Sequence, residues 1–170
     1  MIIGVPKEIL KNETRVGVIP ATIKQLISGG FSVMIETGAG IKSQISDDDF
    51  RNAGAEIVLD ANRVFSGSDI IVKVNSPTDE EIGMIKDGSS YISFFHTMKE
   101  TSKVKTLQNK KVTAYSMHLI PRTTLAQKMD ALSSQTNIAG YKAVLIGACH
   151  IDKYMPLLMT AAGTISPAKV

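Results

Sequence analysis

The chain has 170 residues, about the size of one domain, with 44% hydrophobic residues, 21% charged residues and a net charge of +3. Because this charge is small and the basic residues are scattered, the composition argues against a nucleic-acid-binding or membrane-surface protein. The single cysteine, Cys149, excludes an intramolecular disulfide framework. The sequence also lacks a signal peptide and any apolar run near the ~18 residues of a spanning helix, so a cytoplasmic protein is expected.

Short apolar runs alternate with helical segments along residues 1–117. The runs typical of strands are Met1–Val5, Phe31–Thr37, Glu56–Leu59, Asp69–Val74, Ser90–Phe95 and Val112–Met117. The segments that favour helices are Ala21–Ser28, Asp47–Asn52, Ala61–Phe65, a segment from a Thr78/Glu81 capping box to Gly88, and Ser102–Asn109. This alternation predicts an α/β fold, in which a Rossmann-like, doubly wound and mostly parallel sheet is built from βαβ units.

The last third of the sequence predicts a long connecting helix over residues 132–149. Its smallest side chains recur every four residues, at Ala139, Ala143 and Gly147. Such a stripe lets another backbone approach closely, and an ordinary buried helix is the alternative; both interpretations place the helix and Cys149 in the interior. Thr160–Lys169 resembles a linker, and the closing Pro167–Val170 resembles the start of a strand.

Two signatures of cofactor or metal binding are incomplete in this sequence. The turn Gly38-Ala39-Gly40 follows a predicted strand, but Ser43 stands where a G-x-G-x-x-G fingerprint needs its third glycine. A structural turn is therefore predicted there. The histidines lack metal-ligand spacing, and no metal site is expected.

Positive groups gather at the carboxyl ends of the predicted strands. Lys73 closes a run of β-branched residues, so its ammonium group is expected to emerge at the edge where open α/β sheets bind ligands. His96 follows the strand Ser90–Phe95 at the corresponding place, and Arg15 approaches the same edge from a loop. Together the three groups suit an anionic carboxylate or phosphate. Each by itself is also explained as a solvated strand-end charge or a capping histidine.

The segment 122–135, with the sequence RTTLAQKMDALSSQ, holds the densest set of polar side chains. It offers a guanidinium, an amide, a carboxylate and a hydroxyl group, from Arg122, Gln127, Asp130 and Ser133. Gln127 and Asp130 are three residues apart and share a face if the segment is helical or turn-like. Asp130 or Ser133 also suits the N-cap of the following helix, and spacing alone favours that interpretation.

Five motifs carry a resemblance to a known family: GVPKE at residues 4–8, ETRVGVIP at 13–20, ETGAG at 36–40, MDALSSQTNIAGYKAV at 129–144 and MTAAGTISPAK at 159–169. The chain resembles the N-terminal part of the NAD(H)-binding alpha component of proton-translocating NAD(P) transhydrogenase, a family related to alanine dehydrogenase. The first three motifs are shared with alanine dehydrogenase. The last two, with Arg122 and Gln127, resemble transhydrogenase specifically, although Leu125 departs from the basic residue usual in that loop.

The resemblance implies a nicotinamide site in this polar segment. Arg122, Asp130 and Ser133 would hold the carboxamide of the nicotinamide of NAD(H). Gln127 would reach toward NADP(H) on a partner component. Gln127 and Asp130 are thus the residues expected to act in hydride transfer, which needs two rings near contact and no acid–base group.

Two alternatives to a transhydrogenase component stay open at this point. Arg15, Lys73 and His96 match positions that bind the oxo acid in alanine dehydrogenase, so the chain would be half of an amino-acid dehydrogenase. In a transhydrogenase, the same three residues would be a vestigial substrate site. The other alternative is a truncated fragment that folds and catalyses nothing.

The resemblance also sets expectations for domains, cofactors and partners. Residues 1–130 would form the N-terminal Rossmann-like domain, and residues 131–170 the connecting helix and the start of an NAD-binding domain. The pyrophosphate site of that second Rossmann domain would be missing from this chain. The expected partners are the rest of the alpha subunit, the membrane component, the NADP-binding component and a second copy in a homodimer. The chain would then lie in the cytoplasm, peripheral to the inner membrane, and act as an enzyme within the complex.

Overall fold

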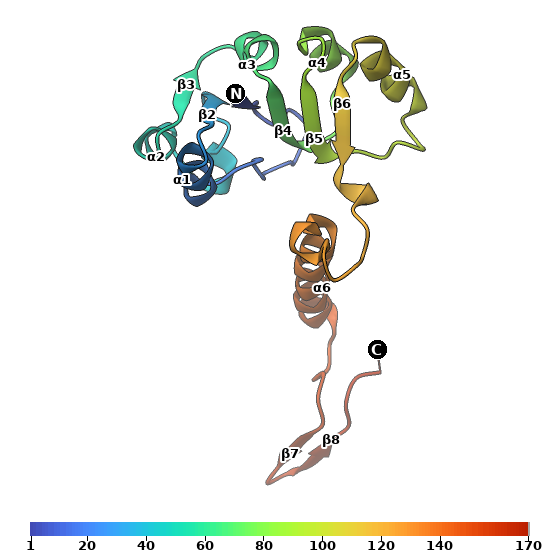
Figure 1. Cartoon of the computed structure of the whole chain (residues 1–170). Coiled ribbons are helices and arrows are strands. Elements are labelled where there is room, and N and C mark those ends of the chain that lie inside the picture. Colours follow the sequence, from blue (N-terminus) through green and yellow to red (C-terminus); the bar gives the residue numbers. More distant parts are fainter. Residues whose placement is uncertain (170) are drawn as a thin grey trace. The chain divides into compact units, whose positions relative to one another are not determined.

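A computed structural model describes residues 1–169 of the chain (Figure 1). Its first part is a six-stranded sheet in the order β3-β2-β1-β4-β5-β6, and each neighbouring pair is parallel. The strands are β1 (Ile2–Val5), β2 (Ser32–Glu36), β3 (Glu56–Val58), β4 (Ile70–Asn75), β5 (Ser90–Phe94) and β6 (Thr113–Ser116). This is the strand order of a doubly wound Rossmann fold, so the predicted α/β class is confirmed.

Helices cover both faces of this sheet (Figure 1). They are α1 (Pro20–Ser28), α2 (Asp47–Asn52), α3 (Ala61–Gly67), α4 (Asp79–Met84) and α5 (Thr101–Asn109). Helices α1 and α2 contact each other, whereas α3 contacts α4 and α4 contacts α5. The crossover therefore changes face between α2 and α3, as the double winding requires.

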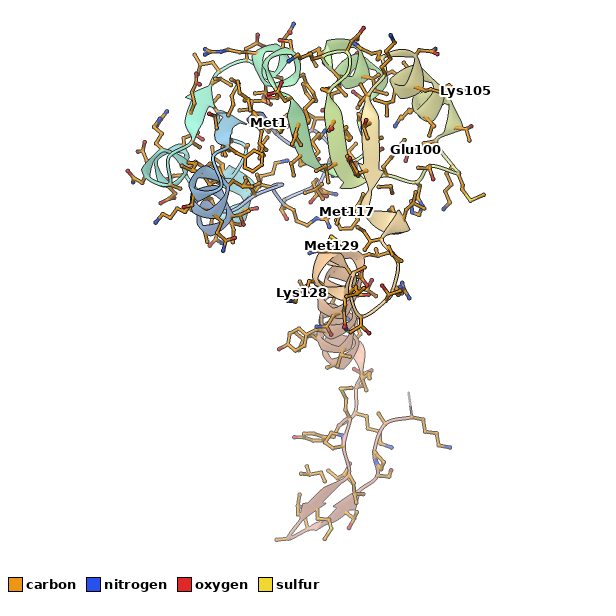
Figure 2. All side chains as sticks on the ribbon, viewed as in Figure 1. Met1, Glu100, Lys105, Met117, Lys128 and Met129 are labelled. Atoms are coloured by element: carbon orange, nitrogen blue, oxygen red, sulfur yellow. The ribbon has the colours of Figure 1, made fainter. Side chains whose placement is uncertain are left out.

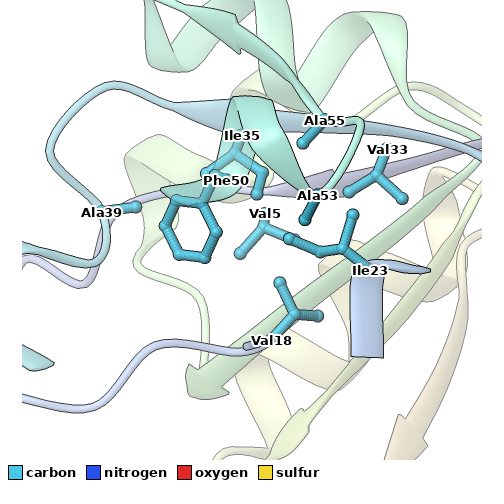
Figure 3. Close-up of a cluster of buried hydrophobic side chains, with 9 residues drawn as sticks. All are labelled: Val5, Val18, Ile23, Val33, Ile35, Ala39, Phe50, Ala53 and Ala55. Atoms are coloured by element: carbon cyan, nitrogen blue, oxygen red, sulfur yellow. The ribbon is translucent and has the colours of Figure 1, made fainter. Parts of the chain in front are cut away.

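The core alternates along the strands because successive side chains point to opposite faces. In β2, Val33 and Ile35 join a cluster with Ile23 of α1 and Phe50 of α2 (Figure 3). Met34, between them, belongs to a separate cluster under α3. Sheet and helices are thus held together by two apolar layers, one on each face.

Local sequence signals fix the ends of several elements. Pro20 starts α1, where its missing N–H removes no helical hydrogen bond. The predicted capping box of α4 is confirmed, because Thr78 Oγ1 accepts the N–H of Glu81 and a carboxylate oxygen of Glu81 accepts the N–H of Thr78. Gly38 has a φ of 72°, which favours glycine, and it forms the turn predicted after β2.

The contacts divide the chain into two compact units, Met1–Pro121 and the part that begins at Arg122. The second unit contains the short 3-10 helix η3 (Gln127–Met129), the helix α6 (Ala131–His150) and the strands β7 (Leu158–Thr160) and β8 (Gly163–Ile165). β7 and β8 pair as an antiparallel hairpin. The domain boundary predicted at residues 130 and 131 falls inside this unit, at the start of α6.

The second unit corrects four expectations. Helix α6 matches the predicted residues 132–149 closely, but every residue of it, the stripe Ala139, Ala143 and Gly147 included, is exposed or half-exposed rather than internal. Cys149 is exposed as well, not a core residue. The physical reason is that the unit supplies a single turn and a hairpin beside the helix, too little to bury it. Residues 160–169 include β8 rather than a linker, residues 166–169 are irregular rather than strand, and Val170 lies outside the described residues.

Candidate functional site

The polar segment after Pro121 surrounds a cavity of about 320 Å³. Its lining contains all four residues singled out from the sequence, together with two threonines that were not: Arg122, Thr123, Thr124, Gln127, Asp130 and Ser133. The structure therefore brings a guanidinium, an amide, a carboxylate and three hydroxyl groups around one small space. The sequence offered a signal for Thr123 and Thr124, because these two hydroxyl-bearing residues come immediately after Arg122.

Backbone hydrogen bonds fold this segment into a compact turn. The carbonyl of Thr123 accepts the N–H groups of Ala126 and Gln127 at 3.1 and 2.9 Å, and the carbonyl of Ala126 accepts that of Met129 at 2.8 Å. Ala126, within this turn, is buried, with 6% of its surface exposed. The bond to the Thr123 carbonyl fixes the backbone of Gln127 at the start of η3. The Gln127 side chain is exposed and lines the cavity.

Asp130 begins α6 and is held by Ser133. One carboxylate oxygen accepts the N–H of Ser133 at 2.9 Å, and the other accepts the Ser133 hydroxyl at 2.6 Å. The bond from the Ser133 hydroxyl is the main cause that lowers the pKa of Asp130, and Arg122 lowers it further. The capping interpretation is thus correct for Asp130, which is a carboxylate at neutral pH and can accept hydrogen bonds.

The second set of predicted residues lies at the carboxyl edge of the sheet, but one member is hidden. The Lys73 side chain is 1% exposed, and its Nζ lies 2.6 Å from a Glu81 carboxylate oxygen and 3.8 Å from one of Glu8. The sequence predicts that this ammonium group emerges at the edge. Instead, two acidic side chains enclose it, because a buried charge is stable only when it is paired.

Arg15 and His96 do reach this edge, near the end of β5. Arg15 donates to both carboxylate oxygens of Glu13, at 2.8 and 2.7 Å, and its guanidinium lies 5.9 Å from the centre of the Phe94 ring. The side-chain bond from Arg15 lowers the pKa of Glu13 to about 2. His96 stacks on His118, whose ring edge meets Phe94. The edge therefore presents aromatic rings and a paired arginine.

A comparison with known proteins identifies the family. Residues 4–139 match the family described as alanine dehydrogenase/PNT, N-terminal domain. The chain belongs to this family. Over its full length it is 44% identical to the NAD(P) transhydrogenase subunit alpha of Haemophilus influenzae, of which it covers 33%. The chain thus spans about a third of that relative.

Solved structures agree with this assignment. A transhydrogenase structure from Sinorhizobium meliloti is 38% identical, with a TM-score of 0.90, and the match covers 99% of this chain and 50% of that one. An L-alanine dehydrogenase structure is 33% identical, with a TM-score of 0.66 over 69% of this chain and 32% of that one. Since 99% coverage includes the second unit, the cavity-lining segment has a counterpart in the transhydrogenase structure.

In this alanine dehydrogenase/PNT N-terminal domain, sequence reasoning missed the residues that organise the sheet edge. Glu8 accepts the N–H of Val74 at 2.6 Å and the side-chain amide of Asn75 at 3.0 Å, which ties the loop after β1 to the end of β4. His118 was missed although it follows β6 as His96 follows β5, so the same strand-end argument would have found it. Among residues 1–169, no helix has the length and apolar character to cross a membrane, and no three acidic, histidine or cysteine side chains are grouped to hold a metal.

Proposed function

We propose that this chain supplies the nicotinamide side of the NAD(H) site of a proton-translocating NAD(P) transhydrogenase, where hydride passes between NAD(H) and NADP(H). The observation that carries the proposal is the cavity whose lining includes Arg122, Gln127, Asp130 and Ser133. It lies in a chain whose match to a transhydrogenase structure covers 99% of its length. Residues 1–130 would then act as the Rossmann-like domain and residues 131–170 as the connection to the NAD-binding domain.

The donor set suits a primary carboxamide, the polar group of the nicotinamide ring. A carboxamide accepts hydrogen bonds at its oxygen and donates two from its nitrogen. Arg122 is a donor, while the Asp130 carboxylate and the Ser133 hydroxyl oxygen are acceptors, so the ring would be held in one orientation. Bound NAD(H) supplies the hydride chemistry, and the chain contributes positioning, which is worth roughly 7–11 kcal/mol of a reaction barrier in favourable cases.

The remaining parts of the site would come from partners. The pyrophosphate of NAD(H) would be bound by the rest of the alpha subunit, NADP(H) by the NADP-binding component that Gln127 faces, and proton movement would belong to the membrane component at the inner membrane. A homodimer is also proposed, because the largely apolar second half of α6, from Ile138 to Cys149, is exposed or half-exposed. Such a helix is stable when another surface covers it.

An alanine-dehydrogenase-like function is less well supported. It would use Arg15, Lys73 and His96 to bind an oxo acid. The Lys73 ammonium group is enclosed by Glu81 and Glu8, with a side-chain exposure of 1%. A substrate carboxylate would have to displace a buried partner to reach it, and Arg15 is already bonded to both oxygens of Glu13. An inactive fragment is the other alternative, and binding measurements separate it from the proposal.

Isothermal titration of NADH tests the proposal, first with the chain alone and then with the chain mixed with the rest of the alpha subunit. Binding in the mixture is expected. Arg122→Ala should weaken it roughly 10–100-fold, since a charge-assisted hydrogen bond is worth about 1.5–3 kcal/mol. Lys128→Ala is the matched control, because it removes one charge from the same segment without altering the cavity lining.

Two results would overturn the proposal. One is a mixture that neither associates nor binds NADH, which favours the inactive fragment. The other is an equal loss of NADH affinity in the Arg122 and Lys128 variants, which would mean that the loss comes from the change in net charge alone. Turnover of pyruvate, ammonia and NADH would instead support the amino-acid dehydrogenase.

A further inference from the structure

Two histidines stack where the strands β5 and β6 end. His96 lies just beyond β5, and His118 lies on the short 3-10 helix η2 (Met117–Leu119), which directly follows β6. Their ring centres are 3.8 Å apart and the ring planes are inclined by 22°. Figure 2 shows Met117 of η2 at the end of β6 and Glu100 at the start of α5. The proposed nicotinamide site uses neither histidine.

The His118 ring is one of the contacts that hold η2 against the sheet. On one side it stacks on His96, and its edge meets the Phe94 ring at a centre-to-centre distance of 5.7 Å. Two hydrogen bonds also attach this segment, one from the Ser116 hydroxyl to the carbonyl of Phe95 and one from the His118 N–H to Ser116 at 3.2 Å. Loss of the stack would therefore remove a direct contact between η2 and the residue that follows β5 by two positions.

The charges around His118 favour its neutral form. Burial is the main cause that lowers the pKa of His118, and the positive charges of His96 and Lys99 lower it further. Glu100 acts in the opposite direction. Arg15, on Phe94, adds a further positive group at this edge. Two neutral imidazoles can stack face to face, whereas two imidazolium rings at this distance repel each other.

We propose that the His96–His118 stack is a proton-controlled clamp on η2, closed while the rings are neutral and opened when both are protonated. Opening would free residues 117–121, the segment that leads directly into Arg122. The chain would thus carry a pH-sensitive joint just before its polar segment. Histidine suits this role because its charge changes near physiological pH. The proposal goes beyond the nicotinamide site and does not depend on it.

The direction of the pH effect follows from the sign of the pKa shift. The pKa of His118 lies below its ordinary value of 6.5 in the folded chain, so the unfolded chain binds the proton more readily. The stabilising contribution of the stack is therefore fully present above pH 6.5 and is lost as the pH falls from there through the lower, folded-state pKa. Acid, not base, should open the clamp.

Hydrogen exchange of the full chain between about pH 8 and pH 5 tests the clamp, with rates corrected for the intrinsic effect of pH. The backbone amides of residues 117–120 should lose protection roughly fivefold or more on acidification, while those of β4 stay protected. His118→Phe keeps a ring but removes the titration, so this variant should show the same protection at both pH values. His150→Phe, on the exposed end of α6, is the matched control and should behave like the unaltered chain.

Unchanged protection in the unaltered chain would overturn the proposal, and so would a pH response that survives in His118→Phe. If that variant does not fold, His96→Phe removes the other imidazole of the stack and leads to the same expectation. A nuclear magnetic resonance titration of the ring protons adds an independent readout. The His118 signals should shift at a pH below the ordinary histidine value of 6.5, and a midpoint at or above that value would contradict the clamp.

Discussion

The two units of this chain divide stability and chemistry between them. In Met1–Pro121, the large side chains Tyr91, Phe50 and Phe65 are fully buried under helices on both faces of the sheet. From Arg122 to residue 169, every described residue except Ala126 is exposed or half-exposed. Yet this second unit carries the polar cavity. The difference teaches that the first unit has its own core, whereas the second buries almost none of its residues.

Helix α6 makes the contrast sharpest. From Ile138 to Cys149 its only charged residue is Lys142, and Ile138, Tyr141 and Val144 are among its exposed side chains. A surface helix of a globular protein has one apolar face and one polar face, whereas an apolar helix belongs in an interior. Helices of this length also gain most of their stability from packing rather than from propensity. The exposed surface of α6 is therefore consistent with the proposed homodimer.

The largest expected effect tests the difference in packing between the two units. Phe50→Ala removes a fully buried ring from the first unit and should lower the free energy of unfolding by about 3–5 kcal/mol. Leu145→Ala, on α6, removes a side chain that is 44% exposed and should change it by less than about 1 kcal/mol in the isolated chain. Urea unfolding followed by circular dichroism measures both. Comparable losses would mean that the second unit is packed as the first is.

The buried ion pair gives the next largest effect. Lys73→Met leaves Glu81 and Glu8 buried without their cation, which should cost about 3–5 kcal/mol. Lys86→Met is the matched control, because Lys86 and its partner Asp69 are both solvent-exposed. This substitution should cost about 0–1 kcal/mol of stability. The same urea titration separates the two. A Lys73 variant as stable as its control would show that the pair is not what holds this sheet edge.

Local signals explain why much of the fold was predictable. The capping box of α4 lies within four residues, so Thr78 and Glu81 reveal it without knowledge of the rest of the chain. Strand β4 was also predictable, because its residues are buried or half-buried on both faces and its β-branched residues follow one another without polar alternation. The enclosure of Lys73 was not predictable, since Glu8 is 65 residues away in sequence and reaches it only through the fold.

The candidate site was predictable for a different reason. Asp130 and Ser133 are three residues apart, and their pairing at the start of a helix follows from local geometry. That the same residues line a cavity with Arg122 depends on the turn at Thr123, which spacing alone does not reveal. The role in nicotinamide binding came from the family resemblance. The exposure of α6 was missed because an apolar helix predicts burial without naming the surface that buries it.

A smaller effect concerns the second unit within the proposed transhydrogenase complex. Gln127→Asn keeps the amide but shortens the side chain, so a group that reaches toward NADP(H) would be withdrawn. We expect hydride transfer in a reconstituted transhydrogenase to fall roughly 10–100-fold, with NADH affinity nearly unchanged. Gln108→Asn, on the exposed surface of α5, is the control. Stopped-flow transfer rates and NADH titrations measure the two quantities, and equal losses in both would contradict the proposed role.

The smallest expected change in stability separates two roles of Asp130, as the cap of α6 and as a proposed acceptor for the carboxamide. Asparagine caps helices about as well as aspartate, so Asp130→Asn should change the stability of α6 by only a few tenths of a kcal/mol, whereas Asp130→Ala should cost about 0.5–2 kcal/mol. If the carboxylate also accepts hydrogen bonds from the carboxamide, both variants should weaken NADH binding in the mixture with the rest of the alpha subunit. Circular dichroism reports the cap, and titration calorimetry reports the ligand. Unchanged affinity in Asp130→Asn would leave this residue a cap alone, and the cavity would then owe its carboxamide selectivity to Arg122 and Ser133.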